Sequence, residues 1–257
     1  MSVSRGKFLK SLGSALPGMI LGSGVAGAAQ NLINKIAAPS ESVPTPVSVE
    51  NKGPAKTEFI KSGPTDGNRI ALTFDDGPTP GVTEVILDEL KKRNLTATFF
   101  MIGQRIAAAP ELARRVYAEG HEIGNHTFTH AKLKGLSDQQ VLAEIQKTNF
   151  IMDETLYHRP AWFRPPFGEL RQDQSALLQR EELGVILWSV DSLDWSQPDE
   201  SKIVQTILAE TKPGSIILCH DLHLQIANCI GEILDGLVQR GFTFVNISNL
   251  LNATSIK

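Results

Sequence analysis

The sequence predicts an α/β fold built from parallel strands, and two observations support this class. From Arg69 onward, short runs rich in β-branched and aromatic residues alternate with longer amphipathic runs, a pattern typical of strands and helices in turn. Several of the longer runs carry helix signals: Ser137 precedes an apolar-periodic run, and Gly120 and Gly241 follow the ends of two others. Strands separated by helices form parallel β/α units, so we expect either a doubly wound sheet or a reduced (β/α) barrel.

The expected elements follow one another from residue 69 towards the C-terminus. The predicted strands are residues 69–74, 97–102, 122–125, 161–164, 185–190, 215–219 and 242–247. The predicted helices lie near residues 80–93, 110–119, 137–156, 173–181, 199–210 and 225–239. In both architectures ligands bind at the carboxyl ends of the strands, so chemically capable side chains are expected there.

The N-terminal region has the organisation of an export signal. A positively charged segment around Arg5 precedes residues 11–29, which carry no charge and are mostly small or apolar. This stretch closes on Ala26-Gly27-Ala28, which fits a small-residue cleavage site. We therefore predict a signal peptide over residues 1–28 and export to the periplasm, the cell wall or the medium. A single membrane anchor is the rival interpretation, and a proline and several glycines within the apolar stretch disfavour it.

A proline-rich segment follows the predicted signal peptide. Residues 37–67 contain five prolines, with serine, threonine and glycine between them, and show no apolar periodicity. We therefore predict a flexible linker over residues 29–67, followed by one folded domain over residues 68–257.

Charge and cysteine content exclude some classes of protein. The 257 residues carry 25 Lys and Arg against 28 Asp and Glu, a net charge of −3, so we expect no nucleic-acid partner. Cys219 and Cys229 match neither a zinc-knuckle nor a CxxC spacing. They are expected either as a disulfide, if the fold brings their Cα atoms within about 7 Å, or as two small buried residues.

Two histidines and two aspartates are the candidates for a metal site. His126 and His130 follow the third predicted strand, and Asp75 and Asp76 end the first. Two imidazoles with one carboxylate suit zinc or a similar divalent metal and leave positions open for water. One aspartate would face the metal and its neighbour the water, a division that spacing alone does not assign. The competing interpretations are two surface histidines and an acidic turn that caps the helix near residues 80–93.

A third histidine lies at the end of the sixth predicted strand. His220 is our candidate for a general acid that protonates a leaving amine or alcohol. His223 is a competing acid a few residues further along. The purely structural alternative is a buried His220 that is hydrogen-bonded to Asp221.

Arginine, acidic and aromatic residues end two further strands. Arg164 closes the fourth predicted strand, and its forked guanidinium suits a carboxylate such as Asp75. Asp191, Asp194 and Trp195 follow the fifth. The tryptophan is either a core residue or one wall of a sugar-binding groove.

Five short motifs occur in order along these strand ends. They are Thr73-Phe74-Asp75-Asp76-Gly77, His126-Thr127-Phe128-Thr129-His130, Arg164-Pro165-Pro166-Phe167-Gly168, Asp191-Ser192-Leu193-Asp194-Trp195 and Leu218-Cys219-His220-Asp221. Together they resemble the polysaccharide deacetylase family, also called the NodB-homology family or carbohydrate esterase family 4. The resemblance covers residues 68 to about 250 and implies a distorted (β/α)7 barrel, with residues 68–257 as the catalytic domain.

The resemblance also implies roles around the metal. It implies that Asp75 is the general base and that Arg164 holds it. It implies that Asp76, His126 and His130 bind the metal. The implied ion is a divalent metal, first of all Zn²⁺, with Co²⁺, Ni²⁺ and Fe²⁺ also fitting these ligands.

Further implied roles concern the acid and the substrate pocket. His220 would be the general acid, and Asp194 would orient it. Trp195 and Leu218 would shape the pocket around the acetyl group, and the backbone N–H of Phe167 would help to stabilise the oxyanion. Many relatives have tyrosine at the position of Phe167, so a backbone role survives here and a phenol role does not.

The implied activity is metal-dependent hydrolysis that removes acetyl groups from N-acetylated sugars of a polysaccharide. Peptidoglycan, a chitin-like polymer and an exopolysaccharide are all candidate substrates. The alternatives are an O-acetyl ester hydrolase acting on a xylan-type glycan and a non-catalytic carbohydrate-binding relative. We expect a monomer that binds no nucleic acid and has no membrane span once the signal is cleaved.

Overall fold

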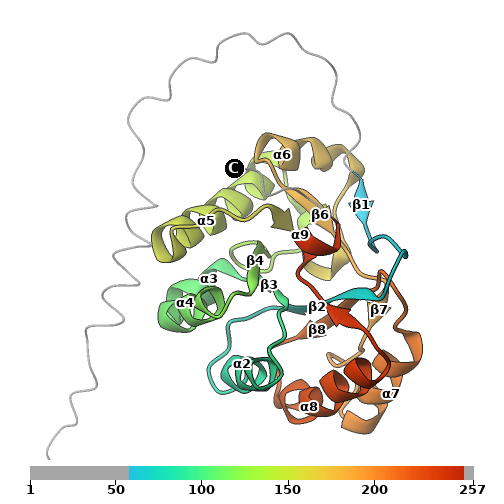
Figure 1. Ribbon diagram of the computed structural model, residues 1–257. Coiled ribbons are helices and arrows are strands. Elements are labelled where there is room, and N and C mark those ends of the chain that lie inside the picture. Colours follow the sequence, from blue (N-terminus) through green and yellow to red (C-terminus); the bar gives the residue numbers. More distant parts are fainter. Residues whose placement is uncertain (1–57, 252–257) are drawn as a thin grey trace, which may run out of the picture. The chain divides into compact units, whose positions relative to one another are not determined.

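The computed structural model describes residues 58–251, which Figure 1 shows as a curled sheet with helices around it. The predicted signal peptide and residues 29–57 of the predicted linker lie outside the described residues. Within residues 58–251, no helix has both the length and the apolar character needed to cross a membrane.

The described strands form one sheet, and all of its pairings are parallel. They are β1 (Phe59–Ile60), β2 (Arg69–Asp75), β3 (Thr98–Met101), β4 (Glu122–Asn125), β5 (Trp162–Phe163), β6 (Gly184–Ile186), β7 (Val190–Asp191), β8 (Ile216–His220) and β9 (Thr243–Phe244). Their order is β1-β6-β5-β4-β3-β2-β8-β7, and β9 pairs with β2. The prediction of a parallel α/β fold is therefore confirmed.

Residues 184–191 form a bent segment whose two strands lie near opposite ends of the strand order. Strand β6 pairs with β1 and β5, whereas β7, only a few residues later, pairs with β8. We predicted one strand over residues 185–190, but the backbone turns at Leu187 because its N–H bonds to Ile60 and its carbonyl accepts the Arg164 side chain. The turn brings the sheet into a distorted, incompletely closed barrel, as the resemblance implied.

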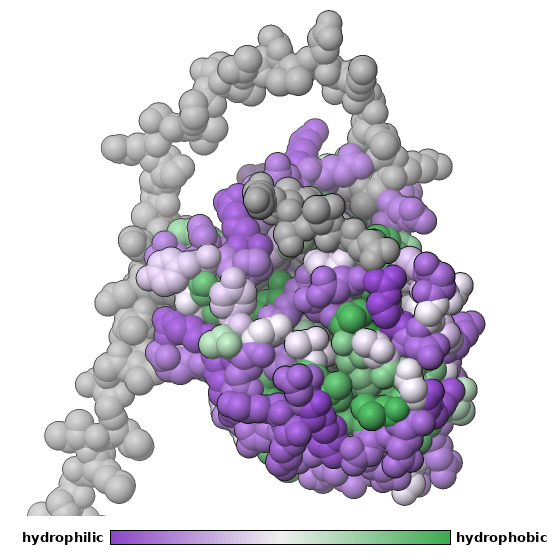
Figure 2. Space-filling view, viewed as in Figure 1, coloured by the Kyte–Doolittle hydropathy of each residue, from purple (hydrophilic) through white to green (hydrophobic). Residues whose placement is uncertain are grey.

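Helices surround the sheet in Figure 1, where α5 packs against α3 and α4, and α8 against α2 and α7. The helices are α2 (Thr83–Lys92), α3 (Gly103–Ala108), α4 (Pro110–Ala118), α5 (Asp138–Leu156), α6 (Ser175–Arg180), α7 (Glu200–Glu210), α8 (Leu224–Gln239) and α9 (Ile247–Leu250). Short 3-10 turns are η1 (Leu133–Gly135), η2 (Pro166–Gly168) and η3 (Gln172–Gln174). On the face in Figure 2, hydrophilic residues cover most of the surface and apolar residues gather towards its middle.

The predicted helix signals operate as expected. The Ser137 hydroxyl accepts the backbone N–H of Gln140, whose side chain in turn accepts the N–H of Ser137, so α5 begins with a full capping box. Gly120 and Gly241 have positive φ angles of 85° and 80°, the left-handed conformation that ends a helix most easily at glycine.

Besides the 3-10 turns, one short strand and two short α-helices were not predicted. Strand β1 lies within the residues assigned to the linker, and it pairs with β6, so the ordered domain begins before residue 68. Helices α3 and α9 have six and four residues, too few for a periodic apolar pattern to stand out.

Helix α9 closes one end of the barrel. Ile247 and Leu250 are fully buried in a cluster with residues from β2, β3, β6 and β8. The amino-end interior is thereby filled with apolar side chains, which leaves the carboxyl ends of the strands as the open end.

The two cysteines are both buried and free. Of the two expectations for Cys219 and Cys229, the small buried residue is therefore confirmed and the disulfide is wrong.

Candidate active site

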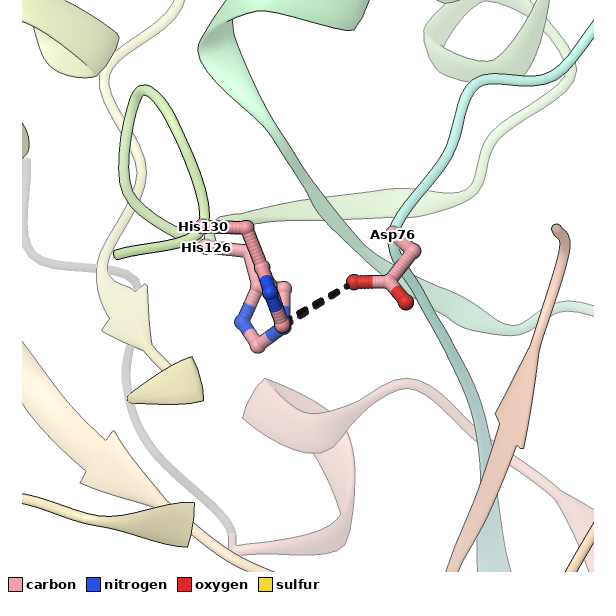
Figure 3. Close-up of side chains that lie close together, drawn as sticks. All are labelled: Asp76, His126 and His130. Carbon is pink, nitrogen blue, oxygen red and sulfur yellow. Dashed lines mark ion pairs between the residues drawn. The ribbon is translucent and has the colours of Figure 1, made fainter. Parts of the chain in front are cut away.

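The polar residues predicted at strand ends meet at the open end of the barrel. Three of them form a cluster that could hold a metal ion: Asp76 after β2, and His126 and His130 after β4. In Figure 3 both imidazoles point towards the Asp76 carboxylate. Asp76 Oδ1 lies 3.5 Å from Nε2 of His126 and 3.3 Å from Nε2 of His130.

The donor set fits a divalent cation. Asp76 Oδ1 is buried and has no hydrogen-bond partner among the described residues, an arrangement that is costly unless a cation completes it. Burial alone raises the pKa of Asp76, but the neighbouring His126 and His130 outweigh burial and lower it to about 2. Burial, together with the nearby His126, lowers the pKa of His130. An ionised carboxylate beside a neutral imidazole is the state in which both bind metal.

His126 is fixed by a backbone acceptor. Its Nδ1 lies 2.7 Å from the carbonyl oxygen of Arg164, so this nitrogen carries the proton and donates it. The lone pair of Nε2 is left to face Asp76, which is the tautomer that a metal ligand requires.

The segment between the two histidines is a tight loop rather than a helical turn. Thr127 and His130 have positive φ angles of 65° and 59°, strained values for residues with side chains. Asn125 Oδ1 accepts the N–H of Thr127, and Thr127 Oγ1 accepts the N–H of His130. Glu144 of α5 accepts two further backbone N–H groups of the loop. Sequence reasoning missed Asn125 and Glu144, because both act on the loop backbone and neither lies in a recognisable spacing with it.

Asp75 lies beside the cluster and is held by Arg164. Arg164 is fully buried, and its Nη1 donates to Asp75 Oδ1 at 2.6 Å and to Thr73 Oγ1 at 2.8 Å. Its other nitrogens donate to the carbonyl oxygens of Ile186 and Leu187. Asp75 Oδ2 is left 3.7 Å from His126 Nε2, facing the metal cluster.

On the other side of the site, His220 pairs with Asp194. His220 Nδ1 lies 2.7 Å from Asp194 Oδ1, and its backbone N–H donates to Asp194 Oδ2. Burial by itself lowers the pKa of His220, but the hydrogen bond and charge of Asp194 raise it to about 9. The structural alternative was a hydrogen bond from His220 to Asp221, and it is wrong, because Asp221 bonds to Thr83 instead. His223 lines the same pocket and stands just before α8.

The three candidate metal ligands, together with Asp75 and His220, line one pocket of about 390 Å³. Phe167, on one side, and Trp195, on the other, are 54% and 60% exposed, so Trp195 belongs to the groove and not to the core. Leu218 lies buried in the pocket wall. Asp191 also lines the pocket, and its Oδ1 accepts the backbone N–H of Leu193.

Two further hollows adjoin this pocket. One shares Phe167 and Trp188 with it and extends to Lys61, with a volume of about 250 Å³. The other shares Trp195 and His223 with it and has a volume of about 340 Å³. The two smaller hollows share no lining residue with each other, so they extend the pocket at two different places.

Comparisons with known proteins agree with this geometry. The family profile described as polysaccharide deacetylase matches residues 62–187. A peptidoglycan-N-acetylglucosamine deacetylase of Bacillus cereus is 34% identical over 203 residues, which cover 77% of this chain and 74% of the relative. A chitooligosaccharide deacetylase of a Bradyrhizobium species is 41% identical over 174 residues, covering 64% of this chain and 80% of the relative.

A solved structure is also similar. The crystal structure of the Bc1960 peptidoglycan N-acetylglucosamine deacetylase superimposes with a TM-score of 0.76 at 33% identity. The match covers 79% of this chain and 96% of that chain.

Proposed function

Because the chain belongs to the polysaccharide deacetylase family and is a polysaccharide N-deacetylase, we propose specific roles for the residues at its open barrel end. The observation that carries the proposal is the arrangement of three groups around one pocket. A candidate metal cluster lies at its base, an arginine-held aspartate beside the cluster, and an aspartate-held histidine on the opposite side.

Asp76, His126 and His130 are the proposed metal ligands. Three protein ligands leave coordination positions open for water and substrate, which is typical of catalytic and not of structural zinc sites. We propose Zn²⁺, and the same ligands also suit Co²⁺, Ni²⁺ and Fe²⁺. When bound, such an ion supplies Lewis acidity that polarises the acetyl carbonyl and favours deprotonation of water.

Asp75 is the proposed general base. Arg164 occupies one of its carboxylate oxygens, so the second oxygen, on the side of the metal cluster, is the one that accepts a proton from the attacking water. The arginine also holds the carboxylate in a single orientation, which a base needs if it is to meet the water in the reactive geometry.

His220 is the proposed general acid. Its Nδ1 is engaged by Asp194, which leaves Nε2 to donate a proton to the sugar nitrogen as the C–N bond breaks and acetate forms. The raised pKa of about 9 keeps the ring protonated at neutral pH.

Three residues are proposed to hold the acetyl group during this reaction. The backbone N–H of Phe167 stabilises the negative charge that develops on the carbonyl oxygen, a contribution of about 2.7–4 kcal/mol in typical oxyanion sites. Leu218 and Trp195 form apolar walls for the methyl group.

We propose that the substrate is a polymer of the cell-wall type and that the protein acts outside the cytoplasm as a monomer. The two adjoining hollows, which meet the pocket at different residues, support a glycan that continues beyond the reacting sugar. Exposed aromatic rings at both sides suit sugar faces. The relatives named for peptidoglycan and for chitooligosaccharides support an N-acetylated glucosamine-type unit.

Acetate release from a panel of glycans tests this function. The panel contains N-acetylated peptidoglycan, N-acetylated chitin oligomers and O-acetylated xylan, each with and without a chelator. We expect release from an N-acetylated glycan, loss on chelation and recovery when Zn²⁺ is returned. Activity that a chelator leaves intact would contradict the metal chemistry, and release from xylan alone would favour the ester hydrolase.

A further inference from the structure

Asp221 is a buried carboxylate that the proposed mechanism does not use. It is 0% exposed, and its Oδ1 has no hydrogen-bond partner among residues 58–251. No ion pair involves Asp221 within residues 58–251. Its other oxygen, Oδ2, accepts the Thr83 hydroxyl at 2.6 Å. A buried carboxyl oxygen without a hydrogen-bond partner costs free energy, so we ask what else the position of this side chain contributes.

The carboxylate lies directly against the turn that carries Asp75 and Asp76. A Cβ placed on Gly77 would come within 2.0 Å of Asp221 Oδ2, so no side chain fits at this point of the turn. The backbone N–H of Asp221 donates to the carbonyl oxygen of Asp75 at 3.1 Å. Asp221 therefore contacts the turn through both its main chain and its side chain.

A second path connects Asp221 to the same turn through helix α2. The Thr83 hydroxyl, which donates to Asp221, accepts the backbone N–H of Thr79 at 2.7 Å. Thr79 lies two residues after Gly77, so the far end of the turn is also connected to the carboxylate.

The turn needs such support because it holds a ligand in a strained conformation. Asp76 has a φ of 77°, in the left-handed region that residues with a Cβ rarely occupy. Strained backbone of this kind persists only where its surroundings hold it in place. A relaxed turn would rotate the Asp76 carboxylate away from His126 and His130.

We propose that Asp221 is a positioning residue for the metal site, which clamps the turn from Asp75 to Thr79 so that Asp76 faces the two histidines. The inference rests on the proposed ligand role of Asp76. Groups that orient metal ligands from behind typically contribute about 10- to 100-fold to metal affinity or activity.

Metal affinity of purified protein tests the proposal without reliance on activity. Metal-free wild type, Asp221→Ala, Asp221→Asn and Thr83→Val are titrated with Co²⁺ and followed by absorption. Thr211→Val is the matched control, because the Thr211 hydroxyl is equally buried and donates to a carbonyl at the end of α7. We expect Asp221→Ala to weaken binding about 10- to 100-fold, with Asp221→Asn and Thr83→Val nearer the lower limit and Thr211→Val unchanged.

Hydrogen exchange of the metal-free proteins gives a second measurement. Amides of residues 75–79 are expected to exchange faster in Asp221→Ala than in wild type, while those of α5 keep their protection. If Asp221→Ala does not fold, the Co²⁺ affinity of folded Thr83→Val tests the proposal instead: weaker binding than wild type supports it, and equal binding contradicts it.

The outcomes separate the two proposals. Folded variants that bind Co²⁺ as tightly as a binding-competent wild type, with unchanged exchange over residues 75–79, would overturn the role of Asp221 and leave the metal site intact. A wild type that binds no divalent cation would instead overturn the metal site, and with it the inference.

Discussion

Asp194 holds His220 at two points, through a 2.7 Å contact between its Oδ1 and the ring Nδ1 and a 2.7 Å hydrogen bond from the His220 backbone N–H to its Oδ2. The pair fixes the orientation of the imidazole and sets its charge. Burial favours the neutral ring, but the Asp194 carboxylate outweighs it and raises the pKa of His220 to about 9. The geometry therefore supplies a charged proton donor at the pH where most enzymes work.

Substitution of Asp194 by asparagine is expected to move the pH dependence of kcat. A general acid acts only while it is protonated, so the basic limb of the wild-type profile is expected to fall as the pH rises through the pKa of His220, about 9. In Asp194→Asn the charge that raises this pKa is absent, so the basic limb shifts to lower pH. A pH–rate profile measures the shift, and an unchanged basic limb would assign that limb to another group.

Substitution of His220 by asparagine is expected to lower kcat by about 10²- to 10⁴-fold without loss of bound metal. His223→Asn is the matched control, because His223 lines the same pocket but lacks the bond to Asp194. Its kcat is expected to change far less. Metal content is measured alongside kcat, and equal losses of kcat in the two variants would reject His220 as the specific acid.

The adjacent aspartates are expected to respond differently to loss of charge. Asp75→Asn keeps the metal and loses turnover, because Asp75 is the proposed base and is already held by Arg164. Asp76→Asn loses metal, because Asp76 supplies the oxygen nearest both histidines. Metal analysis after dialysis distinguishes the two variants. Equal metal loss in both would contradict the proposed division into a base and a metal ligand.

Removal of the Arg164 side chain is expected to destabilise the protein by about 3–5 kcal/mol, because Asp75 would be left as a buried charge without its partner. Lys134→Ala is the control: the side chains of Lys134 and its partner Glu169 are 54% and 47% exposed, and such surface pairs contribute about 0–1 kcal/mol. Urea unfolding monitored by circular dichroism measures both. Similar losses of unfolding free energy in the two variants would show that Asp75 can remain buried without Arg164 at little cost in stability.

Much of the site could be predicted because parallel strands bring distant residues to one edge. The predicted strand over residues 122–125 coincides with β4, and the histidines that follow it meet Asp76 from β2 as expected. Alternation of apolar and amphipathic runs is a local property of the sequence, and the rule that ligands gather at carboxyl ends then locates the site.

Other features depend on contacts that local patterns do not encode. The break between β6 and β7 follows from the carbonyl of Leu187 turning to the guanidinium of Arg164, more than twenty residues earlier in the chain. Glu144 of α5 accepts backbone N–H groups of the histidine loop. In the sequence it cannot be distinguished from the other charged residues on the outer face of this helix. The choice of Asp194 over Asp221 as the partner of His220 depends on how two loops meet.

The helix at the amino end of the barrel has a consequence for the order in which products leave. Because Ile247 and Leu250 belong to a buried apolar cluster in the barrel interior, we expect acetate formed beside Asp75 not to pass through the barrel. Acetate is then expected to leave by the open side of the pocket, where we propose that the glycan binds. A glycan that stays bound over this opening would trap the acetate, so we expect the polymer to dissociate or slide before the next turnover.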